Sequence, residues 1–346
     1  MGKCVVVVDF GLGKTKISAY KKKNGKLMLF SGAVFDTPTG GFSEPELLQM
    51  LAVHLKKIDV RRGVLYVLLP VDEKNIIAGE ADYPMGTAKD VANIIKNNLS
   101  NFISENAEQY NCDWRLIEGY PSGHGRFQIA AIKNSDMDII HDIAERNHLN
   151  LVYADLSSNA LENLAKQLRK DKKYGLNSSE DAVALVDVGH RSAKIVVLSK
   201  DRIIRNVSVL HDFYRMDKII MGTLGELKKD KEIIPELLKL NPSYAHNISL
   251  YPAFLEGATA EIVRNIKQSV SSENRYRLNT IFFTGGLYKM PQLVSKVKES
   301  FEVPCFSFPM SDFVLINDDY IFCEVNKADP NADIFAASLG ALMGGK

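Results

Sequence analysis

The chain has 346 residues, of which 46% are hydrophobic and 25% charged, as is typical of a globular protein with a substantial core. Its formal net charge of +1 provides no overall field to attract nucleic acid or an anionic membrane surface. No stretch approaches the ~18–20 apolar residues of a membrane span, and no signal peptide is recognisable. We therefore expect a cytoplasmic protein of about two domains, whose contact with any membrane runs through a partner.

The first predicted element begins with "VVVVDFGLGKTKISAY" at 5–20, which ends like a P-loop in Gly-Lys-Thr. A P-loop would need its first glycine at position 8, where the chain has Val8. The residues that follow alternate and then break at Asn24-Gly25, the strongest short hairpin signal. The pattern therefore predicts three consecutive strands joined by tight turns, at 5–9, 16–21 and 26–31.

A different pattern occupies the next hundred residues. The segment "GVLYVLLP" at 63–70 reads as a strand that ends in proline. Thr87-x-x-Asp90 is a helix-start signal, and apolar residues at helical spacing follow it up to Ile103. Further on, the sequence predicts two strands, 114–119 and 126–133, and a helix over 136–147.

A second copy of the first element lies about half a chain length further on, where 183–210 read "VALVDVGHRSAKIVVLSKDRIIRNVSVL". The matched pairs are Asp9 with Asp187, Gly11 with Gly189, Lys16 with Lys194 and Ile17 with Ile195. The repeated feature is Asp-x-Gly at the end of a buried strand, whereas Gly-Lys-Thr does not repeat. A turn that used Asp and Gly for geometry alone would not require such a repeat.

Two facing Asp-x-Gly turns suit the binding of a nucleotide's phosphates. Glycine lets the backbone come close to a ligand, and successive N–H groups form an anion-binding nest. An aspartate at each strand end, Asp9 and Asp187, can hold Mg²⁺ on the phosphates. Lys14 and Lys16 share strand parity, so both are expected to point toward the phosphates.

A third element follows in "TIFFTGGLYKMPQLVSKVKESF" at 280–301. A short strand over 281–283 leads to Gly285-Gly286, and a helix with one apolar face comes next. Such a Gly-Gly lets the backbone lie flat against a planar ring, although a tight strand–helix turn alone also explains it. The end of the chain, "NADIFAASLGALMGG" at 331–345, reads as a helix of small residues.

In this order, the elements resemble the actin/hexokinase/Hsp70 superfamily of ATP-binding proteins. The two hairpins look like its phosphate-1 and phosphate-2 motifs, 284–287 like its adenosine motif, and 331–345 like its connecting helix. The resemblance implies an α/β fold of duplicated actin-like (ribonuclease H-like) lobes that binds ATP and Mg²⁺. The implied cofactor residues are Asp9, Gly11, Leu12, Gly13, Lys14, Lys16, Asp187, Gly189, His190, Arg191, Gly285, Gly286 and Leu287.

The order of elements after residue 70 resembles the small inserted α+β subdomain of FtsA and of the type IV pilus assembly protein PilM family. The stretch "FQIAAIKNSDMDIIHDIAERNHLNLVYADLSSNAL" is similar to PilM in particular. The sequence ends at Lys346, directly after the crossing helix, without the amphipathic tail of FtsA, which favours the PilM branch. The expected domains are a first lobe at 1–70 plus 147–185, the inserted subdomain at 71–146, a second lobe at 186–330, and the crossing helix at 331–346.

Several positions depart from the superfamily pattern. His190 and Arg191 stand where relatives carry small or hydroxyl residues, and the glycines expected after Ile204-Arg205 are missing. Glu226 and Lys229 match a Glu-x-x-Lys pair that holds the ribose in relatives, but a solvated helix face gives the same spacing. No residue stands out as the base that phosphoryl transfer needs, so we expect at most a slow ATPase.

By resemblance, PilM proteins dock the N-terminal cytoplasmic segment of the inner-membrane protein PilN and link it to the pilus motor and platform proteins. The docking groove would be lined from roughly 71–150. We therefore expect a cytoplasmic protein held at the inner face of the membrane by this partner, without direct insertion and without a nucleic-acid partner; self-association stays open. The alternatives are a filament-forming division or segregation protein of the FtsA kind and, less favoured, a small-molecule kinase of the same superfamily.

Overall fold

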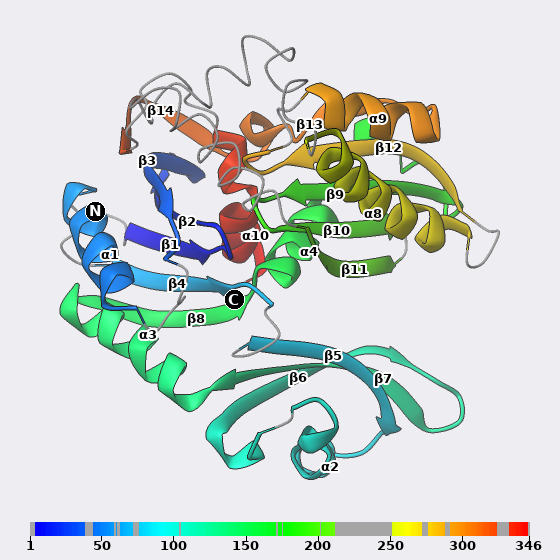
Figure 1. The fold of residues 1–346 in the computed structure, drawn as a ribbon, viewed down its shortest axis with the longest axis horizontal. Helices are drawn as coiled ribbons and strands as arrows, with labels where there is room; N and C mark the ends of the chain where they lie inside the picture. Colours follow the sequence, from blue (N-terminus) through cyan, green and yellow to red (C-terminus); the bar gives the residue numbers. More distant parts are fainter. Residues whose placement is uncertain are drawn as a thin grey trace.

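A computed structural model shows two lobes, with a smaller subdomain beside the first (Figure 1). Each lobe is built on one mixed β-sheet, and the subdomain has a three-stranded sheet of its own. The structure describes residues 4–38, 44–58, 60, 63–71, 76–103, 105–170, 172–174, 176–200, 202–211, 251–271, 276–287, 291–323 and 332–344.

The sheet of the first lobe has six strands in the order β14-β3-β2-β1-β4-β8. β1, β2 and β3 form the expected antiparallel run, and β4, β8 and β14 each add a parallel pair. Asn24 and Gly25 have φ of 53° and 78°, the left-handed turn that the Asn-Gly signal predicts. The strands are β1 (Cys4–Phe10), β2 (Lys14–Lys23), β3 (Lys26–Asp36), β4 (Gly63–Leu69), β8 (Leu149–Leu156) and β14 (Leu315–Cys323).

The sheet of the second lobe has five strands in the order β11-β10-β9-β12-β13. Its order and strand directions are those of β3-β2-β1-β4-β8 in the first lobe, so the sequence repeat reflects a duplicated fold. The strands are β9 (Asp181–Val188), β10 (Ser192–Ser199), β11 (Ile203–Leu210), β12 (Arg277–Thr284) and β13 (Cys305–Ser307).

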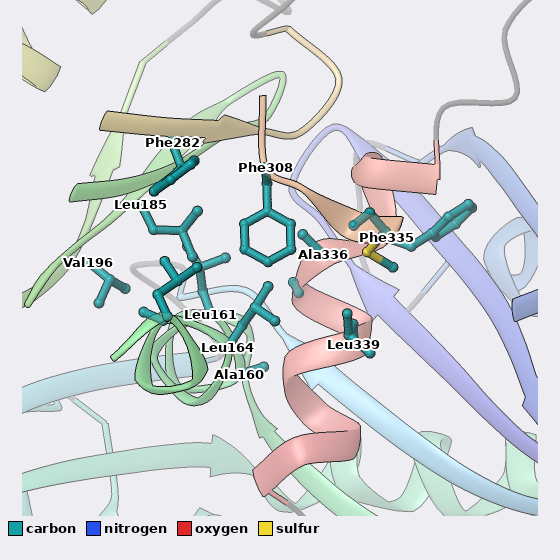
Figure 2. Packing of buried hydrophobic residues seen from close by; sticks show 14 of the residues in the cluster. Ala160, Leu161, Leu164, Leu185, Val196, Phe282, Phe308, Phe335, Ala336 and Leu339 are labelled. Atoms are coloured by element: carbon teal, nitrogen blue, oxygen red, sulfur yellow. The ribbon is translucent and has the colours of Figure 1, made fainter. Parts of the chain in front are cut away.

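Helices cover both sheets and also fill the space between them. α1 (Pro45–Lys57) and α3 (Asn134–Arg146) pack on the outer face of the first sheet, and α8 (Tyr251–Ser271) and α9 (Pro291–Phe301) on that of the second. α4 (Ser157–Leu168) and α10 (Ala336–Gly344) lie between the sheets, where their side chains and those of the second sheet point toward one another (Figure 2). α10 lies within the range expected for the crossing helix and is preceded by a 3-10 turn at Ala332–Phe335.

The inserted subdomain pairs its strands in the order β5-β7-β6, all antiparallel, with α2 packed on the sheet. The predicted start of α2 is confirmed, because the Thr87 hydroxyl accepts from the Asp90 N–H and the Asp90 carboxylate accepts from the Thr87 N–H. The elements are β5 (Ile76–Pro84), α2 (Ala88–Asn97), β6 (Tyr110–Gly119) and β7 (His124–Lys133).

Two strands lie outside the lobes in which the expected boundaries place them. β9 begins at Asp181 and belongs entirely to the second sheet, although 185 was the expected end of the first lobe. β14 falls within the range expected for the second lobe, but it pairs in parallel with β3 and extends the first sheet. The chain therefore returns to the first lobe before it enters α10.

Glu162 of α4 is a buried carboxylate that joins the subdomain to both lobes. It is 4% exposed; the Arg115 guanidinium of β6 donates Nη1 and Nη2 to its two oxygens at 2.9 and 2.6 Å. Asn206 of β11 donates to Oε2 at 2.8 Å, and the Lys166 ammonium lies 2.7 Å from Oε1. Burial alone would raise the pKa of Glu162, but Arg115 and Lys166 outweigh it and lower the pKa to about 2.

Within the part of the chain that the structure describes, no helix has both the length and the apolar composition to cross a membrane.

Candidate functional site

The two Asp-x-Gly turns have the same local geometry. The Gly11 N–H donates to the Lys14 carbonyl at 3.1 Å, and the Gly189 N–H donates to the Ser192 carbonyl at 2.9 Å. Gly11 needs to be glycine, since a Cβ there would lie 2.3 Å from the Lys14 oxygen. The matched sequence positions are thus equivalent in structure as well.

Each turn places a lysine directly opposite its aspartate on the neighbouring strand. Lys16 of β2 is the register partner of Asp9, and Lys194 of β10 is that of Asp187. Lys16 Nζ lies 3.4 Å from Asp9 Oδ2, and Lys194 Nζ lies 3.0 Å from Asp187 Oδ2. The four side chains are at most 10% exposed, so both ion pairs are buried.

The remaining carboxylate oxygens differ between the two turns. Asp9 Oδ1 accepts from the Ser157 hydroxyl, at the start of α4, at 2.9 Å. Asp187 Oδ1 is buried and has no hydrogen-bond partner among the described residues. A buried acceptor left in this way is costly unless a ligand, a metal ion or water fills the position.

The two acidic strand ends face each other across the boundary between the lobes. Burial alone would raise the pKa of Asp187, but the charges of Lys194 and of Lys16, from the other lobe, lower it. In the same way, burial would lower the pKa of Lys194, but Asp187 and Asp9 raise it. The turns also meet directly, because a Cβ at Gly13 would lie 2.7 Å from the His190 Cβ.

The Gly-Gly element lies against the second turn. Gly285 has φ of 93°, and a Cβ there would lie 2.3 Å from Asp187 Oδ1. The Leu287 N–H donates to the Val188 carbonyl at 3.0 Å, and a Cβ at Gly286 would lie 4.0 Å from the His190 ring. The structure therefore brings all three predicted motifs to one place.

Some of the predicted site residues do not contact Asp9 or Asp187. The Lys14 ammonium pairs with Asp36 at 2.8 Å and is 31% exposed. Leu12 and Arg191 are half-buried in the two turns, and the Arg191 carbonyl accepts from the His211 N–H at 2.8 Å. The predicted ribose pair, Glu226 and Lys229, lies outside the described residues.

Two residues of the site, Lys194 and Ser157, have no role predicted from the sequence. The repeat matches Lys194 to Lys16, and this match could have predicted a role for Lys194 at the site. Ser157 is 148 residues from Asp9 in sequence, and no pattern connects the two.

The site fits a nucleotide with a divalent cation. The open oxygen of Asp187 and the glycines at positions 11, 13 and 285 provide an acceptor and a backbone surface without side chains. Across the described ranges, no group of three or more His, Cys, Asp or Glu side chains is placed to hold a metal ion. With Asp9 and Asp187 as its protein ligands, a cation here would take its other ligands from phosphate and water, as Mg²⁺ commonly does.

The duplicated sheets and the two facing Asp-x-Gly turns define an actin-like fold, a class whose members generally bind nucleotide with Mg²⁺. The family model of the type IV pilus assembly protein PilM matches residues 67–324. The chain belongs to this family.

The chain is similar to solved structures. The chain is similar to the structure of a "PilM-PilN type IV pilus biogenesis complex", with a TM-score of 0.75, 15% identity, and 99% of this chain and 98% of that chain covered. The ethanolamine utilization protein EutJ from Carboxydothermus hydrogenoformans has a TM-score of 0.49 and 11% identity, over 99% of this chain and 90% of that one. No curated protein is significantly similar to the chain in sequence.

Proposed function

We propose that this protein docks the N-terminal cytoplasmic segment of a PilN-like inner-membrane protein and links it to the motor and platform proteins of the type IV pilus machinery. The observation that carries the proposal is the PilM family match over residues 67–324, supported by the similarity to the PilM-PilN complex. In this role the protein is cytoplasmic and peripheral at the membrane, where the partner holds it.

An exposed apolar strand edge supports a peptide-docking role. β8 ends the order of the first sheet, on the side of the subdomain (Figure 1), and an extended peptide can add to such an edge. Val152 of β8 is 52% exposed and falls where the β4–β8 register shifts. The Arg115 guanidinium of β6 lies close enough to Tyr153 and Asp155 of β8 to interact with them electrostatically. We assign the partner segment to the edge of β8 around Val152, on the side of β6, which we call the β8–β6 surface.

We also propose that the site between the lobes binds ATP with Mg²⁺. Asp9 and Asp187 would hold the cation, whose chemistry is to neutralise phosphate charge. The two turns would contact the phosphates, and Gly285, Gly286 and Leu287 the adenosine. Glu226 and Lys229 are proposed for the ribose. We assign no catalytic base, so ATP would act as a structural or switching ligand.

Replacing Val152 by glutamate is expected to weaken binding of the partner segment by at least about tenfold, because a charge would have to be buried at the β8–β6 surface. The measurement is calorimetry with a synthetic peptide of the N-terminal cytoplasmic segment of a PilN-like protein. Val53→Glu is the matched control: Val53 is also a valine with 52% exposure, but it lies on α1. If the wild-type protein does not bind the peptide, the docking role is wrong. If both variants bind the peptide equally weakly, the assigned surface is wrong.

A further inference from the structure

Lys194 gives the second turn a buried cation at a position where the first turn also has one. Both lysines lie opposite their aspartates in antiparallel register, so each pair projects from the same face of its sheet. The result is a group of two carboxylates and two ammonium groups, contributed equally by the lobes. We call Asp9, Lys16, Asp187 and Lys194 the charge quartet.

The charge quartet is neutral and almost closed to solvent. Side-chain exposure is 9% for Lys194 and 3% for Asp187, against 10% for Lys16 and 2% for Asp9. The charges also interact across the lobes, Lys194 with Asp9 and Lys16 with Asp187. Because water is largely excluded, these interactions are stronger than on an exposed surface.

This arrangement changes what a divalent cation can contribute. Lys194 already neutralises Asp187 from the Oδ2 side, which weakens the attraction of that carboxylate for a second cation. An ammonium group has three donors, and lysine is a common phosphate-binding point charge. A triphosphate between the turns would therefore meet two ammonium groups that can donate to it, and two carboxylates whose repulsion the lysines already offset.

We propose that Lys194 is a phosphate-binding residue and that Lys16 and Lys194 together neutralise the two carboxylates that a divalent cation would otherwise neutralise, so that the protein binds ATP without requiring Mg²⁺. The inference rests on the proposed ATP site and deepens it. Mg²⁺ can accompany ATP in the site, but the affinity for nucleotide does not depend on it.

The test is the Kd of a fluorescent ATP analogue, measured in EDTA and in excess Mg²⁺ at equal ionic strength. For the wild-type protein we expect the two values to agree within about tenfold. Lys194→Met should weaken binding in EDTA by about 10- to 100-fold, the loss of one charge-assisted hydrogen bond, and Mg²⁺ should recover most of it. Lys194→Arg keeps the charge and should bind in EDTA. Lys298→Met, an exposed lysine of α9, is the matched control.

The outcomes separate this inference from the ATP site itself. Wild-type protein that binds the analogue only in Mg²⁺ would overturn the inference and leave the ATP site standing. Absence of binding in both conditions would overturn both. If the Lys194→Met variant binds the analogue in EDTA as tightly as wild type, Lys194 does not bind phosphate. If circular dichroism shows that Lys194→Met does not fold, the wild-type comparison and Lys194→Arg decide the question.

Discussion

Replacing Arg115 by alanine is expected to lower the free energy of unfolding by about 2–4 kcal/mol, because it leaves the Glu162 carboxylate buried without its bidentate partner. Lys166 and Asn206 still contact Glu162, which keeps the loss below the upper end for a broken buried pair. Arg115 also connects the subdomain to α4 through its hydrogen bonds to Glu162. In the variant, unfolding should therefore begin at a lower urea concentration, and protease cleavage within the subdomain should increase.

The matched control for Arg115→Ala is the same substitution at Arg126, on the neighbouring strand β7. Arg126→Ala removes an exposed pair with Asp82 at 4.0 Å and should cost less than ~1 kcal/mol. Because the pKa of Glu162 in the folded protein is about 2, below its usual value, its ion pairs contribute fully to the free energy of unfolding above pH ~5. This contribution is lost as the pH falls toward 2. This acid-dependent loss should be smaller in Arg115→Ala. Equal stability of the Arg115 and Arg126 variants at pH 7 would contradict the role of Glu162 as a junction.

Replacing Gly340 by alanine is expected to destabilise the protein by about 1–3 kcal/mol or more through overpacking. A Cβ at Gly340 would lie 1.9 Å from the Ala160 carbonyl oxygen and 3.2 Å from the Leu164 Cβ. The first of these atoms is backbone of the neighbouring helix, so α4 and α10 would have to separate at the centre of the core (Figure 2). Thermal and urea unfolding measure the effect.

Gly257→Ala makes the same chemical change where there is room. Gly257 lies within α8, and apart from its chain neighbours and the backbone of its own helix no described atom lies within 4 Å of its added Cβ. Alanine is favoured over glycine inside a helix, so this variant should gain about 0.5–1 kcal/mol. A Gly340 variant as stable as wild type would show that α4 and α10 do not pack this closely in solution.

Local patterns predicted those parts of the fold that local chemistry determines. The hairpins follow from period-two alternation and from Asn24-Gly25, and α2 follows from its capping box. β5 was not predicted because its sequence alternates poorly; its Gly79 is explained only by the fold, where a Cβ would lie 2.6 Å from the Phe102 ring. β14 was placed in the wrong lobe because it pairs with β3, which lies far away in sequence.

Some features of the candidate site could be predicted from the sequence, and others depend on the fold. The aspartates, glycines and lysines of the two turns repeat in the sequence, so their equivalence could be recognised before the structure. The Ser157 contact with Asp9 depends on how α4 begins, and the contact of Gly13 with His190 depends on how the lobes meet. Lys14 was expected to point toward phosphate on strand parity, but parity does not reveal that Asp36 is its partner.

The two repeated turns face each other between the lobes, where we propose that nucleotide binds. Cysteines introduced at Gly13 and His190 test this arrangement most directly, because their Cβ atoms would be close enough for a disulfide after a small shift. We expect mild oxidation to link positions 13 and 190, as shown by peptide mapping, and saturating ATP to slow the reaction by separating the turns. No link between these positions would contradict the facing turns, and equal rates with and without ATP would contradict the nucleotide site.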